Sequence, residues 1–130
     1  MPGIQEVSLY HMTSRASRLI LTHLVPSLPE REQRALVNQL SRASQALPQL
    51  VTEGYARYHE HDQFQKYCQE AMTETYEIVV SLCCCHYWYA TQINTTLCRQ
   101  LIETYSQVSR QLLLLAETHT GGGEHGKPCG

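Results

Sequence analysis

The chain has 130 residues, a length that fits one domain with its own hydrophobic core. Hydrophobic residues make up 42% of it, charged residues make up 17%, and the formal net charge is −2, which excludes a disordered tail and a collagen-like chain. The near-neutral charge also argues against a strongly basic nucleic-acid-binding domain, so any contact with RNA or DNA needs a local basic patch.

No segment of the sequence is apolar enough for export or for crossing a membrane. Glu6, His11, Arg15 and Arg18 interrupt the N-terminal region, so no signal-peptide core is expected there. The longest apolar runs, such as Ile78–Cys85, fall far short of the ~20 residues that a transmembrane helix needs. We therefore expect a soluble, cytoplasmic protein with no membrane partner, whose six cysteines are reduced thiols.

The first predicted helix covers residues 5–24, which contain no Gly or Pro. Pro26 and Pro29 prevent its continuation, because proline removes a backbone donor and restricts the residue before it. Pro29 suits the first turn of a second helix. The negative charges of Glu30 and Glu32 would interact favourably with the positive end of that helix's dipole. The expected buried stripe of the first helix comprises Leu9, Met12, Ala16, Leu19, Ile20 and His23.

The second predicted helix covers residues 29–57, and its apolar residues recur with the spacing 4-3-4-3-4. That spacing is typical of a helix packed against others. Pro48 interrupts the run, but the pattern continues in phase, so we predict one long kinked helix. Its stripe comprises Leu36, Leu40, Ala43, Leu47, Leu50 and Gly54.

Two further helices are expected in the second half of the chain. Asp62 is the predicted N-cap of a helix over residues 63–90, and Asn94 or Thr95 is the predicted N-cap of a fourth helix. The buried face of the third helix comprises Phe64, Tyr67, Ala71, Thr75, Ile78, Leu82, Cys85 and Tyr89. The buried face of the fourth comprises Leu97, Leu101, Thr104, Val108, Leu112 and Leu115.

The end of the chain is rich in glycine and cannot hold a packed element. We therefore predict a bundle domain at residues 1–118 and a flexible tail at residues 119–130. Four amphipathic helices with short connections are the pattern of an all-α, up-down-up-down antiparallel four-helix bundle. Because no segment alternates with period two, no sheet is expected.

The second predicted helix also carries a family motif. Residues 28–57 read LPEREQRALVNQLSRASQALPQLVTEGYAR, with a hydrophobic-Pro start, a Leu-Pro pair and a Glu-Gly-aromatic-x-Arg ending. In these features the chain resembles the 23S ribosomal RNA intervening-sequence protein family, and the likeness covers about residues 9–115. The matching residues are Leu28, Pro29, Glu32, Leu36, Gln39, Arg42, Ala43, Leu47, Pro48, Glu53, Gly54, Tyr55 and Arg57.

The resemblance implies a left-handed bundle that forms ring-shaped homopentamers. It also implies kinship with the accessory variability determinant proteins of diversity-generating retroelements, which bind a reverse transcriptase and its template RNA through a basic surface. For the intervening-sequence branch it implies no established activity. The partners expected on this basis are further copies of the chain, RNA and a reverse transcriptase.

Five arginines are the candidate nucleic-acid-binding residues. Arg31, Arg34 and Arg42 share the polar face of the second helix, and Arg15 and Arg18 extend it onto the first. The first 66 residues hold 7 Lys and Arg against 6 Asp and Glu, whereas the rest hold 3 against 6. In a pentamer this patch becomes a repeated basic belt for phosphates. The alternative is an ordinary solvated face with intrahelical ion pairs.

Tyr87, Trp88 and Tyr89 are the candidate oligomer interface. Three consecutive aromatic residues on one helix cannot all face the core, and Tyr and Trp favour interfaces. Stacking on nucleic acid is the alternative, but it normally needs adjacent cations, and Arg99 is the only one nearby.

The sequence gives no metal, cofactor or catalytic residue. Cys83, Cys84, Cys85 and His86 are consecutive, so on a helix they diverge by ~100° per residue and cannot close on one ion. We interpret the cysteines as small packing residues. The alternative is a half-site of Cys83 and His86, completed by Cys98 or another subunit.

The carboxylates of the third helix are also interpreted structurally. Di-iron bundles need Glu-x-x-His pairs, and none lies within a predicted helix. Glu70, Glu74 and Glu77 form one flank of the third helix, and we expect them at a helix–helix margin facing an arginine.

We therefore expect a non-catalytic, self-associating bundle, a homopentamer by resemblance, that acts as a scaffold for RNA or a protein partner. The alternative is a structural or regulatory homo-oligomer with no nucleic-acid ligand. An enzyme or metal protein that uses Cys83 and His86 is the third class.

Overall fold

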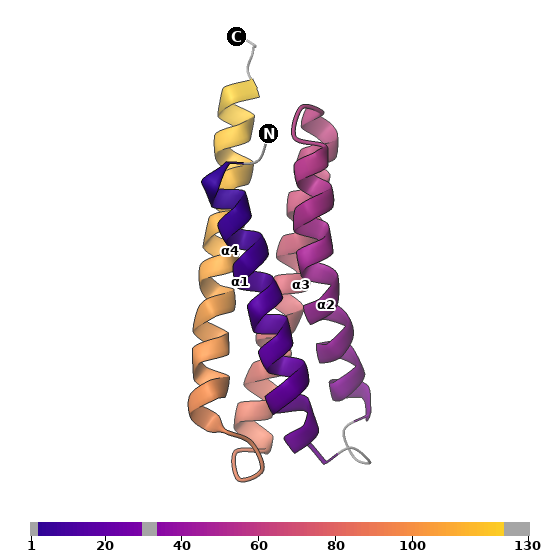
Figure 1. Ribbon diagram of the computed structural model, residues 1–130, viewed down its shortest axis with the longest axis vertical. Coiled ribbons are helices and arrows are strands. Elements are labelled where there is room, and N and C mark those ends of the chain that lie inside the picture. The colour runs from indigo at the N-terminus through magenta and orange to yellow at the C-terminus, as the bar shows by residue number, and fades with distance from the viewer. Residues whose placement is uncertain (1–2, 30–33, 124–130) are drawn as a thin grey trace.

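The computed structural model describes residues 3–29 and 34–123, and this part of the chain contains helices and no strands. Figure 1 shows the long helices side by side, with the start of the first helix and the end of the last helix near the same end of the bundle. The predicted all-α four-helix bundle is confirmed. The helices are α1 (Ile4–Leu19), α2 (Arg34–Ala56), α3 (His61–Trp88) and α4 (Thr95–Gly123), with a π turn η1 (Ile20–Leu24) and a 3-10 turn η2 (Val25–Ser27) after α1.

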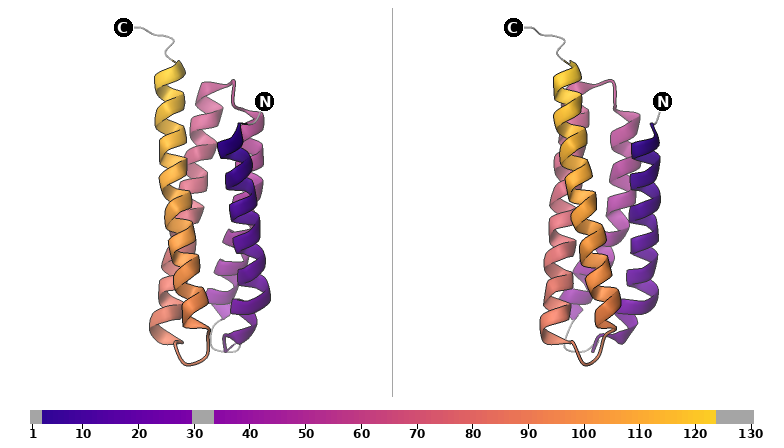
Figure 2. Two further views of the ribbon diagram at one scale, coloured as in Figure 1. Left: turned by 60° about the vertical axis from the view of Figure 1, so that its left-hand side comes forward. Right: turned by 90° about the vertical axis from the view of Figure 1, so that its left-hand side faces the viewer.

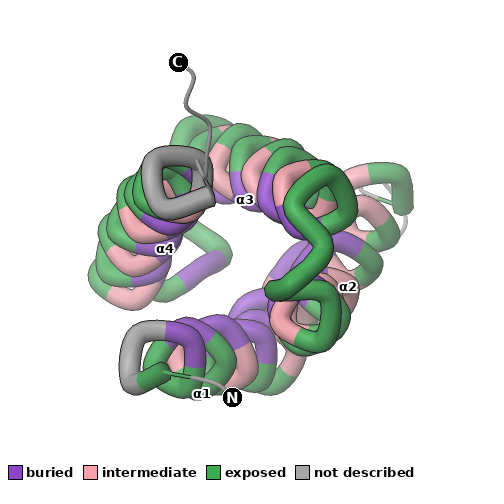
Figure 3. Tube along the Cα trace, turned by 90° about the horizontal axis from the view of Figure 1, so that it is seen from above, coloured by how far each residue is buried: buried purple, intermediate pink, exposed green. Residues whose placement is uncertain are grey.

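The four helices occupy the corners of a square. Consecutive helices pack against each other, and α1 also packs against α4, which closes the up-down-up-down arrangement. In both views of Figure 2 neighbouring helices run antiparallel. Seen along the bundle, α1 and α3 lie at opposite corners, and buried residues line the interior (Figure 3). No helix in the described part of the chain has the length and apolar character to span a bilayer.

Most residues of the predicted stripes are buried in the core. Thr104 is only half-buried, and its neighbour Tyr105, which the sequence analysis did not place in the stripe, is fully buried instead. The interior is filled by side chains with no exposed surface, among them Leu40, Leu47, Ile78, Leu82, Tyr105 and Val108. His23, which was expected in the stripe of the first helix, is exposed instead. It lies in η1, where each residue of the wider π turn advances by a smaller angle than in an α-helix, so the side chain falls outside the stripe.

The end of the first helix follows from its proline. In η1 the Val25 N–H donates to the carbonyl of Ile20, five residues earlier. Widening the turn here relieves crowding, because Pro26 lacks an N–H and its ring clashes with an α-helical carbonyl. Leu28 is extended, with φ −79° and ψ 145°, as expected before Pro29. The second helix was predicted to begin at Pro29, which is not helical in the structure. The described part of α2 starts at Arg34, and residues 30–33 lie outside the described residues.

The second helix continues through Pro48, as the phase of its stripe predicted. Gly54 lies near its end and is buried against α3. A Cβ atom at this position would lie 3.1 Å from the Cβ of Tyr67, which is tighter than normal side-chain packing. The family-motif glycine therefore allows a close approach of α2 and α3.

The bounds of α3 and the start of α4 differ slightly from expectation. Glu60, rather than Asp62, is the N-cap of α3. Asp62 lies in the first turn of this helix, where its negative charge interacts favourably with the positive end of the helix dipole. Tyr89 leaves the helix with φ −126° and ψ 30°, so α3 ends before the predicted residue 90. Asn94 caps α4 as predicted, because its Oδ1 accepts a hydrogen bond of 3.0 Å from the Leu97 N–H.

The fourth helix is longer than predicted. It continues to Gly123, so residues 119–123 are helical and not part of a tail; residues 124–130 lie outside the described part. His119 explains the extension. Its Nε2 donates to the Tyr58 carbonyl at 2.7 Å, and its ring stacks on His61 with centroids 5.1 Å apart. These contacts hold the last turns of α4 against the α2–α3 connection.

Candidate functional site

The outer face of α1 is basic. Arg15 and Arg18 are exposed, as are His11 on the same helix and His23 in η1. Between Val7 and Pro29 the chain has no Asp or Glu. Part of the predicted arginine patch therefore lies on a surface whose own segment supplies no balancing carboxylate.

The arginine on α2 is engaged within the chain. Arg42 forms ion pairs of 3.3 Å with Glu74 and 3.0 Å with Glu77, and Gln39 donates to the same Glu77 carboxylate at 2.9 Å. The bond with Glu74, followed by its charge, raises the pKa of the Arg42 guanidinium. The expectation that the glutamates of the third helix lie at a helix margin facing an arginine is thus confirmed for Glu74 and Glu77.

The described candidate arginines do not share one seam. Arg15 lines the space between α1 and α4, whereas Arg42 sits between α2 and α3, on the opposite side of the bundle (Figure 3). Arg34 is exposed in the first turn of α2, and Arg31 lies outside the described residues. Arg42 would have to break two ion pairs to hold a phosphate. The basic surface that needs no such rearrangement is the α1 face.

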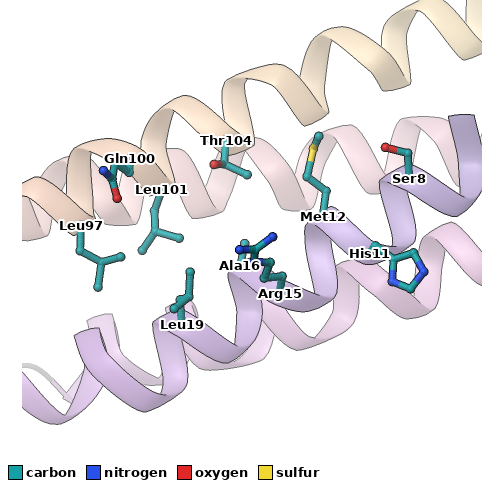
Figure 4. Close-up of a pocket in the computed structure, with 10 residues that line it drawn as sticks. All are labelled: Ser8, His11, Met12, Arg15, Ala16, Leu19, Leu97, Gln100, Leu101 and Thr104. Carbon is teal, nitrogen blue, oxygen red and sulfur yellow. The ribbon is translucent and has the colours of Figure 1, made fainter.

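An open groove of about 640 Å³ runs between α1 and α4. Figure 4 shows side chains of the two helices facing each other across it. Its charged or titratable residues, His11 and Arg15, both come from α1, and no carboxylate lines it. None of the described residues that line it forms a hydrogen bond or ion pair across it. Its lining includes Met12, Arg15, Leu19, Leu97, Leu101 and Thr104.

The outer face of α3 carries exposed apolar residues, which we call the α3 stripe: Tyr76, Val80, Cys83 and Tyr87. The exposed fractions are 70% for Tyr76, 43% for Val80 and 80% for Tyr87. Their spacing of 4-3-4 places them on one line along the helix. Tyr76 and Val80 were missed by the sequence reasoning, although this spacing was visible there beside the buried face.

The aromatic end of α3 divides between surface and core. Tyr87 and Trp88 are exposed, Trp88 to 64%, and their rings meet edge to face with centroids 5.9 Å apart. Tyr89 is half-buried and packs against the hydrophobic core. Of the three candidate interface residues, Tyr87 and Trp88 are therefore available for contact, and Tyr89 is occupied by packing.

Three of the cysteines pack in the interior, as interpreted from sequence. Burial raises the pKa of the thiol to about 11 for Cys68, about 12 for Cys85 and about 11 for Cys98. The Cys98 thiol donates to the Leu82 carbonyl at 3.3 Å. Cys83 is exposed, and the described side chains contain no group of three His, Cys, Asp or Glu able to hold a metal ion.

Comparison with known proteins gives one result. No curated protein and no solved structure matches the chain significantly. Residues 5–113 match the family described as 23S rRNA-intervening sequence protein. This match spans α1 to most of α4, including the Gly54 and Arg42 positions of the motif. The chain therefore belongs to the 23S rRNA-intervening sequence protein family.

Proposed function

We propose that this protein is a non-catalytic scaffold that works in the cytoplasm by self-association. The observation that carries the proposal is the α3 stripe, because aligned, largely exposed aromatic and aliphatic residues mark an interaction surface. Its spacing is that of a helix packed against another helix, yet none of the helices that the structure describes covers it.

The chemistry of the thiols agrees with a non-catalytic role. A thiol nucleophile or metal ligand must be deprotonated, and the three buried thiols have raised pKa values that keep them protonated near neutral pH. The exposed Cys83 lies on the α3 stripe, where it is a small apolar contact.

The family resemblance supports a ring of five copies as the assembled form. A ring needs each copy to present two different surfaces to its neighbours. The α3 stripe is one such surface, and it lies on the outer side of the bundle.

Light scattering of the purified protein tests self-association, with an expected mass that is a multiple of 14.9 kDa. Tyr87→Glu places a charge on the α3 stripe and is expected to lower the assembled fraction. Gln107→Glu, on the exposed face of α4, is the matched control and should assemble normally. A wild-type protein that stays at the single-chain mass throughout the micromolar range would contradict the proposal.

A second candidate function is RNA binding by the α1 face. The observation that favours it is the exposed Arg15 and Arg18 in a segment without carboxylates. Phosphate contacts of this kind weaken as salt rises. The resemblance adds a reverse transcriptase with its template RNA as a partner for the same face.

Gel-shift titration with structured RNA tests this second function. Arg18→Glu should weaken binding at low salt, whereas Arg110→Glu on α4 should change it less. Absence of any RNA binding at low salt would exclude the RNA role and leave a homo-oligomer without a nucleic-acid ligand.

A further inference from the structure

We propose that the groove between α1 and α4 is a docking site for an acidic amphipathic helix of another protein, a contact separate from the proposed self-association through the α3 stripe. Such a helix carries apolar side chains on one face and carboxylates beside them. The groove presents the matching arrangement, an apolar wall with a row of basic side chains next to it.

The groove is longer than its main hollow. A second hollow, of about 390 Å³, shares Leu97 and Gln100 with the first and extends the groove to His23 in η1. Ser8 and His23, which mark its two ends, are fifteen positions apart, or about 22 Å at 1.5 Å per residue. This length matches a helix of about four turns laid along the seam.

The apolar wall comes from both helices. Leu19, Leu97 and Leu101 point into the space between α1 and α4 (Figure 4). Met12 and Ala16 continue the wall along α1. Because Met12, Leu19 and Leu97 are only half-buried, an apolar face laid into the groove would remove their remaining exposed surface from water.

The basic row runs beside this wall on α1. His11, Arg15 and Arg18 follow one another at a spacing of 4-3, which places them on one line along the helix. All three are exposed, and neither arginine forms an ion pair among the described residues. On the α4 side Gln100 and Thr104 are uncharged, and no carboxylate lines either hollow. We therefore expect the carboxylates of the partner helix on the flank that lies against α1.

The same features argue against two other occupants of the groove. The exposed line of the α3 stripe, from Tyr76 to Tyr87, carries no charge that would match the two arginines. RNA would match the arginines, but it has no aliphatic face to cover the leucines of the wall. An acidic amphipathic helix meets both requirements.

Fluorescence anisotropy with a synthetic probe tests this proposal. The probe is a labelled helical peptide of about sixteen residues, with leucines on one face and glutamates on one flank. One control peptide has the same composition in scrambled order, and another has lysine in place of glutamate. We expect the full-length wild type to bind the probe at least about tenfold more tightly than either control peptide.

Charge reversal on the protein is the second arm of the test. Arg15→Glu should weaken probe binding about tenfold at low salt, whereas Arg110→Glu, the matched control on the outer face of α4, should leave it unchanged. Both replaced side chains are exposed and have no ion pair among the described residues, so circular dichroism should show a folded bundle in both variants.

Methyl NMR of the wild type locates the probe. Binding in the groove should shift the methyl signals of Leu97 and Leu101 and leave those of Val80 on the α3 stripe in place. Shifts at Val80 without shifts at the two leucines would overturn the proposal, because the peptide would then cover the stripe.

The remaining outcomes are also decisive. Equal affinity for the probe and the scrambled peptide, or unchanged binding by Arg15→Glu, overturns the proposal. A wild type that binds structured RNA but not the probe overturns it, because the α1 face would then serve RNA. A lower assembled mass of Arg15→Glu in light scattering overturns it as well, because the groove would then hold another copy. A monomeric wild type that binds the probe supports the docking site and contradicts only the proposed self-association.

Discussion

The seam between α2 and α3 is closed at two points, by close packing and by ion pairs, although a hollow of about 510 Å³ also lies between these helices. Among the described residues no such contact closes the seam between α1 and α4, which we call the open seam. At the closed seam Gly54 lets the two helices approach until a Cβ would lie 3.1 Å from that of Tyr67, and Arg42 bridges to Glu74 and Glu77. At the open seam a groove of about 640 Å³ separates the helices. The described side chains that line it form no polar bridge across it.

The difference shows what closes a seam in this bundle. Both seams are built from apolar residues at helical spacing, so the spacing alone is not sufficient. The closed seam adds a small residue at the point of contact and opposite charges on its two helices. At the open seam α1 contributes the cation Arg15, whereas α4 contributes the uncharged Gln100 and Thr104. The positive charge of Arg15 is therefore not balanced by the residues that line the groove.

The largest contrast is expected in thiol reactivity, because one cysteine is buried between α3 and α4 and another is exposed on the outer face of α3. Cys98 is buried between α3 and α4 with its thiol pKa raised to about 11, and Cys83 is exposed. The thiolate is the reactive form, and a buried thiol must wait for an opening of the structure. We expect N-ethylmaleimide, followed by peptide mass spectrometry, to modify Cys83 at least about a thousandfold faster, since domain opening costs at least about 5 kcal/mol. Equal rates would mean that the α3–α4 seam opens readily.

The next largest contrast is expected in the stability lost when an apolar side chain of each region is truncated. Leu47→Ala removes a fully buried side chain of α2 and is expected to cost about 2–5 kcal/mol in the free energy of unfolding. Met12→Ala removes a half-buried side chain beside the groove and should cost about 1 kcal/mol, because part of its surface is already solvated. Urea unfolding measures both. A Met12→Ala loss as large as that of Leu47→Ala would show that the α1–α4 seam is packed.

A bulkier residue at Gly54 should force the closed seam apart. Gly54→Val is expected to destabilise the fold by about 1–3 kcal/mol, because its side chain meets Tyr67. Ala56→Val, at an exposed position of the same helix, is the control for helix propensity. Thermal unfolding of the two variants measures the difference, and equal melting temperatures would disprove the close approach.

The smallest effect is expected from the ion pairs. Arg42→Ala should cost about 0.5 kcal/mol or less, because the guanidinium is largely solvated and exposed pairs are weak. The loss should shrink at high salt, which urea unfolding at two salt concentrations measures. A loss of several kcal/mol would show that charge, and not Gly54 packing, holds α2 to α3.

Much of the fold could be predicted from sequence because helical spacing and proline positions act locally. The stripes through Leu40 and Ile78 and the Asn94 cap depend on near neighbours along the chain, and each is found in the structure. The length of α4 could not be predicted, because its last turns depend on the contact of His119 with the distant Tyr58.

The candidate site was only partly visible in the sequence. The exposure of Tyr87 and Trp88 follows from three aromatic residues in a row. The sequence does not show which arginines are free of ion pairs, because the partners of Arg42 lie more than thirty positions away along the chain. The groove was also invisible, since it depends on how far two complete helices stand from each other.

Light scattering of the wild type beside a double variant of the α3 stripe, Tyr76→Glu with Tyr87→Glu, tests most directly whether the chain self-associates through this stripe. The wild type should have a multiple of the single-chain mass of 14.9 kDa, and the double variant should stay at 14.9 kDa. A wild type that stays at the single-chain mass, or a double variant that assembles as the wild type does, would contradict the account.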